Sequence, residues 1–130
     1  MKKILFIDDE LLEIEPYKTL LEMEGFLVEV IENPEEALTI ITEKIDSYDL
    51  LILDIMMKCG KYDLKETRYG RRTGLKVLEE IRNITAKLPI IILTVVEDPI
   101  LKKEAERFGI NFYLLKPVKP SVLLDSINKL

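Results

Sequence analysis

Polar residues that could do chemistry follow four apolar runs of this chain. Asp8 and Asp9 follow the first run, and Asp54 follows a run of four large aliphatic residues. Thr94 and Lys116 each come directly after a later apolar run. A single acid in such a place is more often a capping or surface residue. If the runs are parallel strands, however, their carboxyl ends meet at one edge of a sheet, and four such ends together predict a site.

The chemistry open to three carboxylates, a hydroxyl and an ammonium group is limited. Clustered carboxylates repel one another unless a divalent cation lies among them, and their hard oxygen atoms suit Mg²⁺. An aspartate can attack phosphorus when the charge of the incoming phosphoryl group is neutralised. With no His and one Cys, the chain is a poor candidate for a zinc site.

Five strands must position these residues. The apolar runs predict strands over residues 2–7, 26–31, 49–53, 88–93 and 112–115. Helical patterns lie between and after them, over residues 10–24, 34–45, 74–83, 99–108 and 120–130. Alternating strands and helices with right-handed crossovers predict an α/β fold, a doubly wound five-stranded parallel sheet with helices on both faces. The flavodoxin-like strand order 2-1-3-4-5 is the first choice, and it places the switch point between Asp8 and Asp54.

Two helix starts have local signals. Asn33 followed by Pro34 is typical of a cap and a first helical residue. Pro16 is costly inside a helix, so we expect the first regular helix to begin near Ile14, with residues 10–13 in a looser turn.

The combined pattern resembles the response regulator receiver domain of two-component phosphorelays. The resemblance depends on the Asp8-Asp9 pair, Asp54, Thr94 and the Lys116-Pro117 pair, in this order and spacing, and it covers essentially the whole chain from residue 3 to 130. It implies one receiver domain over residues 1–130, acting as a stand-alone response regulator. Such a protein is not an enzyme toward other substrates and catalyses only its own phosphorylation and dephosphorylation.

The resemblance also implies a role for each site residue. Asp54 would accept a phosphoryl group from a histidine kinase or a small phosphodonor, while Asp8, Asp9, Asp54 and the carbonyl of Met56 would hold Mg²⁺. Lys116 and Thr94 would bind phosphoryl oxygens. Thr94 and Tyr113 would form the switch that changes partner binding, although an aromatic residue in a strand is often simply packed. Pro117 would follow a cis peptide bond, which the sequence permits.

Some positions depart from the family pattern. Lys58 stands where receivers commonly have proline, and Val95 stands where a small residue is usual, so its branches could narrow access to Asp54. Met56 and Val96, two residues beyond Asp54 and Thr94, are bulky and apolar. Because they offer an attacking water no hydrogen bond, we expect slow self-dephosphorylation.

One irregular stretch, residues 58–73, is about a dozen residues longer than receivers have between this strand and helix. It carries six basic and two acidic residues, a net charge of +4, which leaves −9 on the rest of a chain whose net charge is −5. The stretch could be a solvated flap. The alternative is a docking element or a lid over Asp54.

The composition of the chain limits the number of domains, the kinds of partner and the cellular location that we expect. A chain of 130 residues with 48% apolar content fits one domain, and its acidic balance argues against nucleic acid or a membrane as the main partner. The lone Cys59 and the absence of a long apolar run or signal suit the cytoplasm. Expected partners are a histidine kinase and an unknown protein target. The face of the fourth helix, fifth strand and fifth helix is a candidate homodimer surface.

Three alternatives compete with the receiver domain. A degenerate receiver would bind a partner without being phosphorylated, which the long loop and Val95 favour. A phosphatase of the haloacid dehalogenase type needs a second acid two residues after its nucleophile, but Leu11 follows Asp9 at that distance. A flavodoxin needs a phosphate loop rich in Ser, Thr and Gly after the first strand, and none is present.

Overall fold

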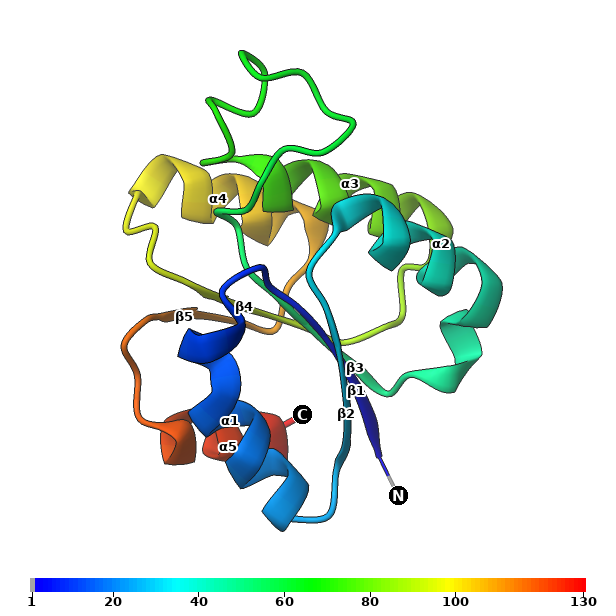
Figure 1. The fold of residues 1–130 in the computed structure, drawn as a ribbon, viewed down its shortest axis with the longest axis vertical. Helices are drawn as coiled ribbons and strands as arrows, with labels where there is room; N and C mark the ends of the chain where they lie inside the picture. The colour runs from blue at the N-terminus through cyan, green and yellow to red at the C-terminus, as the bar shows by residue number, and fades with distance from the viewer. Residues whose placement is uncertain (1) are drawn as a thin grey trace.

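A single parallel sheet of five strands forms the centre of the computed structural model, which describes residues 2–130. The strand order is β2-β1-β3-β4-β5, so the predicted order is confirmed. All four neighbouring pairs are parallel, and their carboxyl ends share one edge of the sheet (Figure 1). The strands are β1 (Lys3–Ile7), β2 (Leu27–Ile31), β3 (Leu50–Leu53), β4 (Ile90–Thr94) and β5 (Phe112–Leu115).

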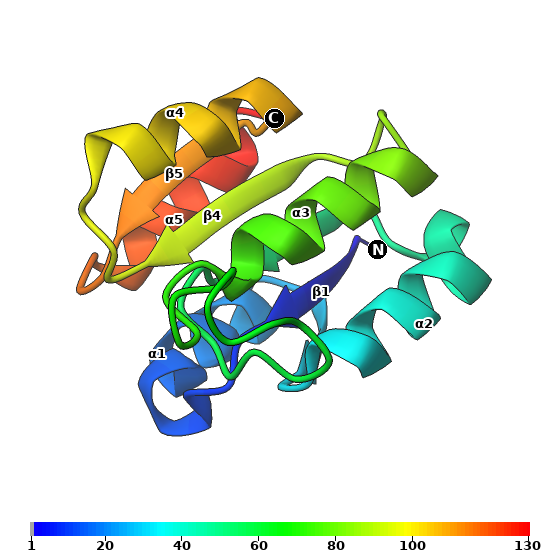
Figure 2. The same ribbon diagram turned by 90° about the horizontal axis from the view of Figure 1, so that it is seen from above.

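Helices cover both faces of the sheet, as the α/β pattern predicts. On one face α1 packs beside α5, and on the other α2, α3 and α4 lie in sequence (Figures 1 and 2). The helices are α1 (Leu11–Met23), α2 (Pro34–Lys44), α3 (Thr73–Ile84), α4 (Pro99–Phe108) and α5 (Pro120–Asn128), with a short 3₁₀ turn, η1 (Ile45–Ser47), after α2.

The central strands are apolar because both of their faces are covered. Every residue of β3 and β4 is buried, and successive side chains alternate between two hydrophobic clusters, one under each layer of helices. Leu51 and Leu53 belong to the cluster under α2, α3 and α4, whereas Leu50 and Ile52 belong to the cluster under α1 and α5. This double burial fixes the point at which β3 delivers Asp54 to the edge of the sheet.

Helix α1 starts earlier than the sequence predicted. It begins at Leu11 and contains Pro16, so the expected loose turn over residues 10–13 is wrong. The amides of Glu13 and Ile14 already donate to the carbonyl oxygen of Glu10, at 3.0 and 3.2 Å. The proline deprives only the carbonyl of Leu12 of its donor, and Leu12 is 92% exposed. Water can therefore satisfy that carbonyl, and the helix tolerates the residue.

The capping signal at Asn33 behaves as expected. The Asn33 side chain accepts from the amides of Glu35 and Glu36, at 2.9 and 3.2 Å, and Pro34 is the first residue of α2. Asp98 caps α4 in the same way by accepting from the amide of Ile100 at 2.9 Å.

The segment from Lys58 to Arg72, called the basic loop below, is folded against the domain. Thr67 is fully buried and its hydroxyl donates to the carbonyl oxygen of Asp63 at 2.8 Å. Arg72 forms an ion pair with Glu104 of α4, and Tyr62 donates to Glu80 of α3 at 2.7 Å. The loop thus bridges two helices, and these contacts argue against a freely solvated flap. Figure 2 shows it beside the ends of β1 and β4.

Candidate functional site

Backbone register brings Asp8 and Asp54 together. Ile7 pairs with Leu53 at the ends of β1 and β3, and the amide of Asp54 donates to the carbonyl oxygen of Ile7 at 3.0 Å. The next residue of each strand is therefore an acid at the same edge. Both are buried, with Asp8 0% and Asp54 3% exposed. Two buried carboxylates side by side require a cation.

Lys116 supplies a positive charge to both carboxylates. Its Nζ lies 2.7 Å from Oδ2 of Asp8 and 3.2 Å from Oδ2 of Asp54. Glu13 of α1 approaches the same ammonium at 3.9 Å. Lys116 reaches the acids because it follows β5, and its own amide donates to the carbonyl oxygen of Thr94 at 2.8 Å. Three strand ends that the sequence predicted to converge therefore meet at one ammonium group.

Electrostatics shift the proton affinities of this cluster. Burial, followed by the neighbouring charge of Asp54, raises the pKa of Asp8 to about 6, against the lowering effect of Lys116. For Lys116 burial lowers the pKa, but the charges of Asp54 and Asp8 outweigh it, so its pKa lies above the ordinary value. The ammonium stays charged while Asp8 is poised to exchange a proton for a metal ion.

Asp9 lies apart from this contact. Its Oδ2 accepts from the amide of Lys58 at 3.0 Å, which is a tie that the sequence did not suggest. Met56 follows Asp54, and its amide donates to Oδ1 of Asp54 at 3.2 Å. Across residues 2–130 no three His, Cys, Asp or Glu side chains are gathered as a ready metal site. Asp9 would have to turn from Lys58 toward Asp54 to complete one.

The donor chemistry nevertheless fits Mg²⁺. Asp8 and Asp54 share one ammonium partner, so their oxygens lie close enough to hold a single cation in its place, and hard oxygen ligands suit that ion. Asp9 and Met56 line the cavity that Asp54 borders. The residues present are therefore compatible with the predicted metal.

The predicted switch residues both contact the connection between β4 and α4. Thr94 ends β4, is fully buried, and its Oγ1 accepts from the amide of Val96 at 3.3 Å. The ring of Tyr113 is partly buried, and its hydroxyl donates to the carbonyl oxygen of Val96 at 2.7 Å. Thr94 and Tyr113 are therefore joined through one residue of the β4–α4 connection. The Lys116–Pro117 peptide bond is cis.

A cavity of about 440 Å³ opens above Asp54. Val95 lines it and is 49% exposed. The prediction that Val96 flanks Asp54 is wrong, because Val96 is buried in the core and does not line this cavity. The remaining lining residues are Asp9, Glu10, Glu13, Met56, Met57, Lys58, Tyr69, Gly70 and Lys116.

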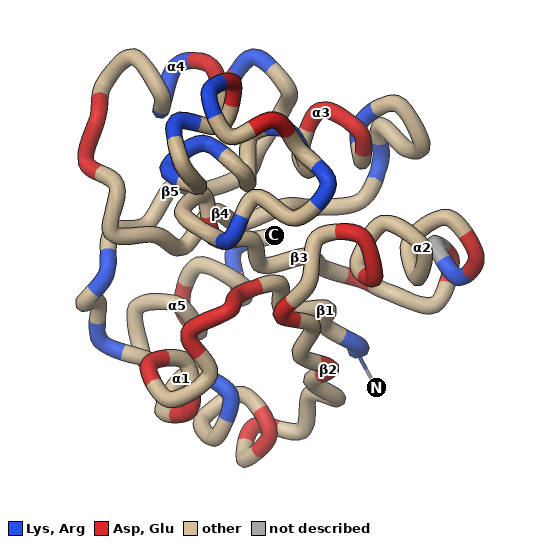
Figure 3. The backbone as a smooth tube through the Cα atoms, turned by 45° about the horizontal axis from the view of Figure 1, so that its top comes forward, with Lys and Arg blue, Asp and Glu red and all other residues tan. Residues whose placement is uncertain are grey.

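A lid over Asp54 was one of the two roles expected for the basic loop, but the sequence did not single out the loop residues that border the cavity. Tyr69 and Gly70 border the cavity although they lie far along the chain from every strand end. The only local feature that marks this position in the sequence is Gly70, which follows the bulky residues Arg68 and Tyr69. Figure 3 shows the basic positions of the loop on one side of the site and acidic positions along the start of α1 on the other.

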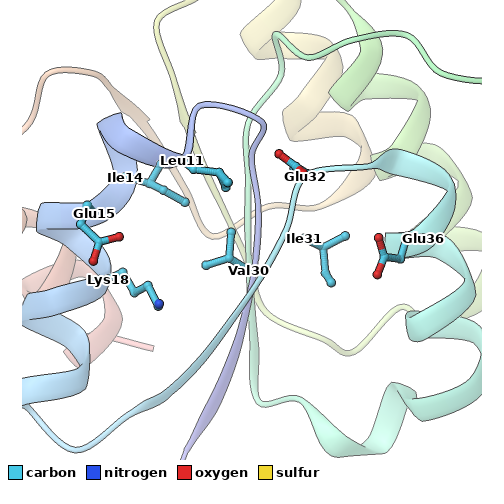
Figure 4. Close-up of a pocket in the computed structure, with 8 residues that line it drawn as sticks. All are labelled: Leu11, Ile14, Glu15, Lys18, Val30, Ile31, Glu32 and Glu36. Carbon is cyan, nitrogen blue, oxygen red and sulfur yellow. The ribbon is translucent and has the colours of Figure 1, made fainter.

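A second cavity, of about 380 Å³, lies between α1, β2 and the start of α2 (Figure 4). None of the predicted site residues lines it. Its lining is apolar at the centre and acidic toward the rim, and consists of Leu11, Ile14, Glu15, Lys18, Val30, Ile31, Glu32 and Glu36.

Comparisons with known proteins agree with the fold. The family model described as "Response regulator receiver domain" matches residues 4–128. The transcriptional regulatory protein CpxR of Klebsiella pneumoniae is 34% identical over 127 residues, which cover 98% of this chain and 48% of that protein. The chain thus spans about half the length of the curated relatives it matches.

Solved structures show the same architecture. A CheY-like receiver domain protein from Methanospirillum hungatei gives a TM-score of 0.83 at 25% identity, covering 99% of this chain and 92% of that one. A two-component response regulator from Clostridium difficile gives 0.81 at 27% identity, covering 99% and 94%. This chain belongs to the response regulator receiver domain family.

Family membership brings general properties with it. Receiver domains take part in signal transduction, bind Mg²⁺ at their phosphorylation site, and interact with histidine kinases and downstream targets. Over the part of the chain that the structure describes, each helix is too short or too polar to span a bilayer.

Proposed function

We propose that this receiver accepts a phosphoryl group on Asp54, from a histidine kinase or a small phosphodonor, and thereby switches the binding of a protein target. The observation that supports this most strongly is the contact of Lys116 with two buried acids, Asp8 and Asp54, of which Asp54 lines an open cavity. A buried carboxylate with a fixed cation beside it is arranged for attack on an anionic phosphoryl group.

Each remaining side chain has a part in the proposal. Asp8, Asp9, Asp54 and the carbonyl of Met56 would hold Mg²⁺, which supplies positive charge opposite the transferring group. Lys116 holds phosphoryl oxygens as a point charge. Thr94 binds another phosphoryl oxygen, and its hydroxyl then no longer accepts from the Val96 amide. Loss of that hydrogen bond would change the β4–α4 connection. The Tyr113 hydroxyl is bonded to the same connection and would respond to the change.

The test is phosphorylation of the purified chain with acetyl phosphate. With Mg²⁺ the mass of the intact protein should rise by one phosphoryl group, and the increase should vanish with a chelator and in Asp54→Asn. A chain that stays unmodified, or an Asp54→Asn variant that is still modified, would contradict the proposal.

An interaction module that works without phosphorylation is the second candidate. The hydrogen bond from the Lys58 amide to the Asp9 carboxylate favours this second candidate, because the bond competes with metal binding by Asp9. Titration of the chain with Mg²⁺ discriminates between the two: a phosphorylated receiver should bind the ion and a degenerate one should not.

The cytoplasm remains the proposed location. A homodimer through α4, β5 and α5 is likewise a proposal, and sedimentation before and after phosphorylation tests it.

A further inference from the structure

In the described part of the chain, the outer edge of β2 has no neighbouring strand, because β2 ends the strand order and pairs with β1 alone. The Leu27 amide donates to the carbonyl oxygen of Lys2, on the β1 side, at 3.0 Å. Successive residues of a strand in a parallel sheet turn their amide and carbonyl groups to opposite sides, so those of Val28 and Val30 point away from β1. No other described group bonds to them, and they are open to a further strand.

The cavity of about 380 Å³ lies against this free edge. Val30, Ile31 and Glu32 line it, together with residues from α1 on one face of the sheet and α2 on the other, whereas no described residue of β1 does (Figure 4). Its wall on the α1 side is apolar, with Ile14 buried and Leu11 45% exposed. Open backbone groups beside an apolar wall form the arrangement to which an extended peptide adds as a further strand.

The charge of the lining indicates which segment fits this edge. Glu15 of α1, Glu32 and Glu36 of α2 line the cavity, and Lys18 is its one basic residue. Within residues 2–130 none of these four side chains forms an ion pair. Three carboxylates against one ammonium group attract a basic partner.

The same charges disfavour a second copy of this chain at the edge. Two copies paired through β2 would bring Glu32 and Glu36 of one against the same residues of the other. Like charges that face each other across paired strands are destabilising. The occupant that this edge favours is therefore a segment of a different protein.

We propose that the free edge of β2 binds an extended, basic segment of a partner protein by strand addition. Its backbone bonds to the open groups of Val28 and Val30, and its basic side chains pair with Glu15, Glu32 and Glu36. Because alternate side chains of a strand point to opposite faces, the segment alternates basic residues with apolar residues that pack on the α1 wall. None of the predicted site residues lines this cavity, so the inference is independent of phosphoryl transfer.

The first test is calorimetric titration of the full chain with short synthetic peptides that have blocked ends. A peptide that alternates valine and lysine should bind at least about tenfold more tightly than one that alternates valine and glutamate. Spermine, a polyamine without peptide groups, should bind more weakly than the lysine peptide. Failure of the lysine peptide to bind, or equal affinity of the glutamate peptide or of spermine, overturns the proposal.

The second test is amide hydrogen exchange, followed by NMR. The lysine peptide should slow exchange at Val28 and Val30 by about tenfold or more, with little change at Leu27, whose amide is already bonded to Lys2. Binding without slower exchange at Val28 and Val30 overturns strand addition. Slow exchange at these two amides in the concentrated chain without peptide would assign the edge to a second copy and would also overturn the proposal.

Substitutions on the rim locate the binding site. Glu15→Gln and Glu32→Gln replace exposed side chains, so the fold should persist, and each should weaken binding of the lysine peptide about two- to fivefold. Glu22→Gln removes the same charge from an exposed position of α1 outside the cavity and should leave the affinity unchanged. An equal loss of affinity in Glu22→Gln would attribute binding to the overall charge of the chain and overturn the site.

Discussion

At the scale of single residues, the buried Asp8 carboxylate determines how the site responds to pH. Its pKa is raised to about 6, first by burial and then by Asp54, so the folded chain holds this proton more tightly than the unfolded chain does. The metal-free domain consequently loses stability as pH rises from the ordinary aspartate value toward 6. A bound cation would prevent that loss of stability, because it would take the place of the Asp8 proton.

Mg²⁺ binding should therefore weaken as pH falls through 6. The proton competes with the ion for Asp8, and a pKa of about 6 predicts roughly tenfold weaker binding at pH 5 than at pH 7. Calorimetric titration with MgCl₂ at the two pH values measures the ratio. Equal affinity at both would contradict the assignment of Asp8 as a ligand, and Asp8→Asn should bind weakly at either pH.

Met56 should slow the loss of the phosphoryl group. It borders the cavity with no group that could orient a water, so the phosphorylated chain should decay on the order of many minutes to hours. Met56→Asn offers an amide to that water and should shorten the half-life by about tenfold. Decay is followed after removal of the donor, with Met23→Asn, at an exposed position on α1, as the control. A wild-type half-life of seconds would refute the expectation.

At the scale of elements, α1 tolerates Pro16 but is weakened by it. Pro16→Ala should restore a bond to the carbonyl of Leu12 and raise the free energy of unfolding by about 1 to 3 kcal/mol. Urea unfolding measures the change. A loss of stability on this substitution would mean that the N-terminal turn of α1 is not helical as described.

The basic loop is a second element whose attachment can be tested. Arg72→Gln removes the ion pair with Glu104, in which both side chains are largely shielded, and should let trypsin cleave the loop several times faster. Lys61→Gln removes the more exposed pair with Glu80 and serves as the control, with little expected effect. Equal cleavage rates for Arg72→Gln and the wild type would show that α4 does not hold the loop.

At the scale of the whole molecule, the sequence predicted what depends on local pattern. Apolar runs and their terminal polar residues were sufficient for the sheet, its strand order and the convergence of Asp8, Asp54 and Lys116. Apart from the start of α1, the failures concern long-range contacts. Nothing near Val96 reveals that it turns into the core, and nothing near Lys58 reveals that its amide holds Asp9.

The fold of the basic loop was unpredictable for the same reason. Its fixed points are a buried Thr67, the Arg72–Glu104 pair and the close approach of Gly70 to Met57, and each depends on a partner distant in sequence or on burial. Whether this loop is longer than in most receivers stays a prediction from the spacing.

The central claim is that Asp54, and no other acid of the chain, captures phosphorus. The direct measurement is to phosphorylate the chain with acetyl phosphate and Mg²⁺, reduce the acyl phosphate with borohydride, and sequence the peptides by mass spectrometry. Reduction converts a phosphorylated aspartate to homoserine. The account predicts homoserine at position 54 alone; homoserine at Asp8 or Asp9, or at no position in a chain that had gained the mass, would contradict it.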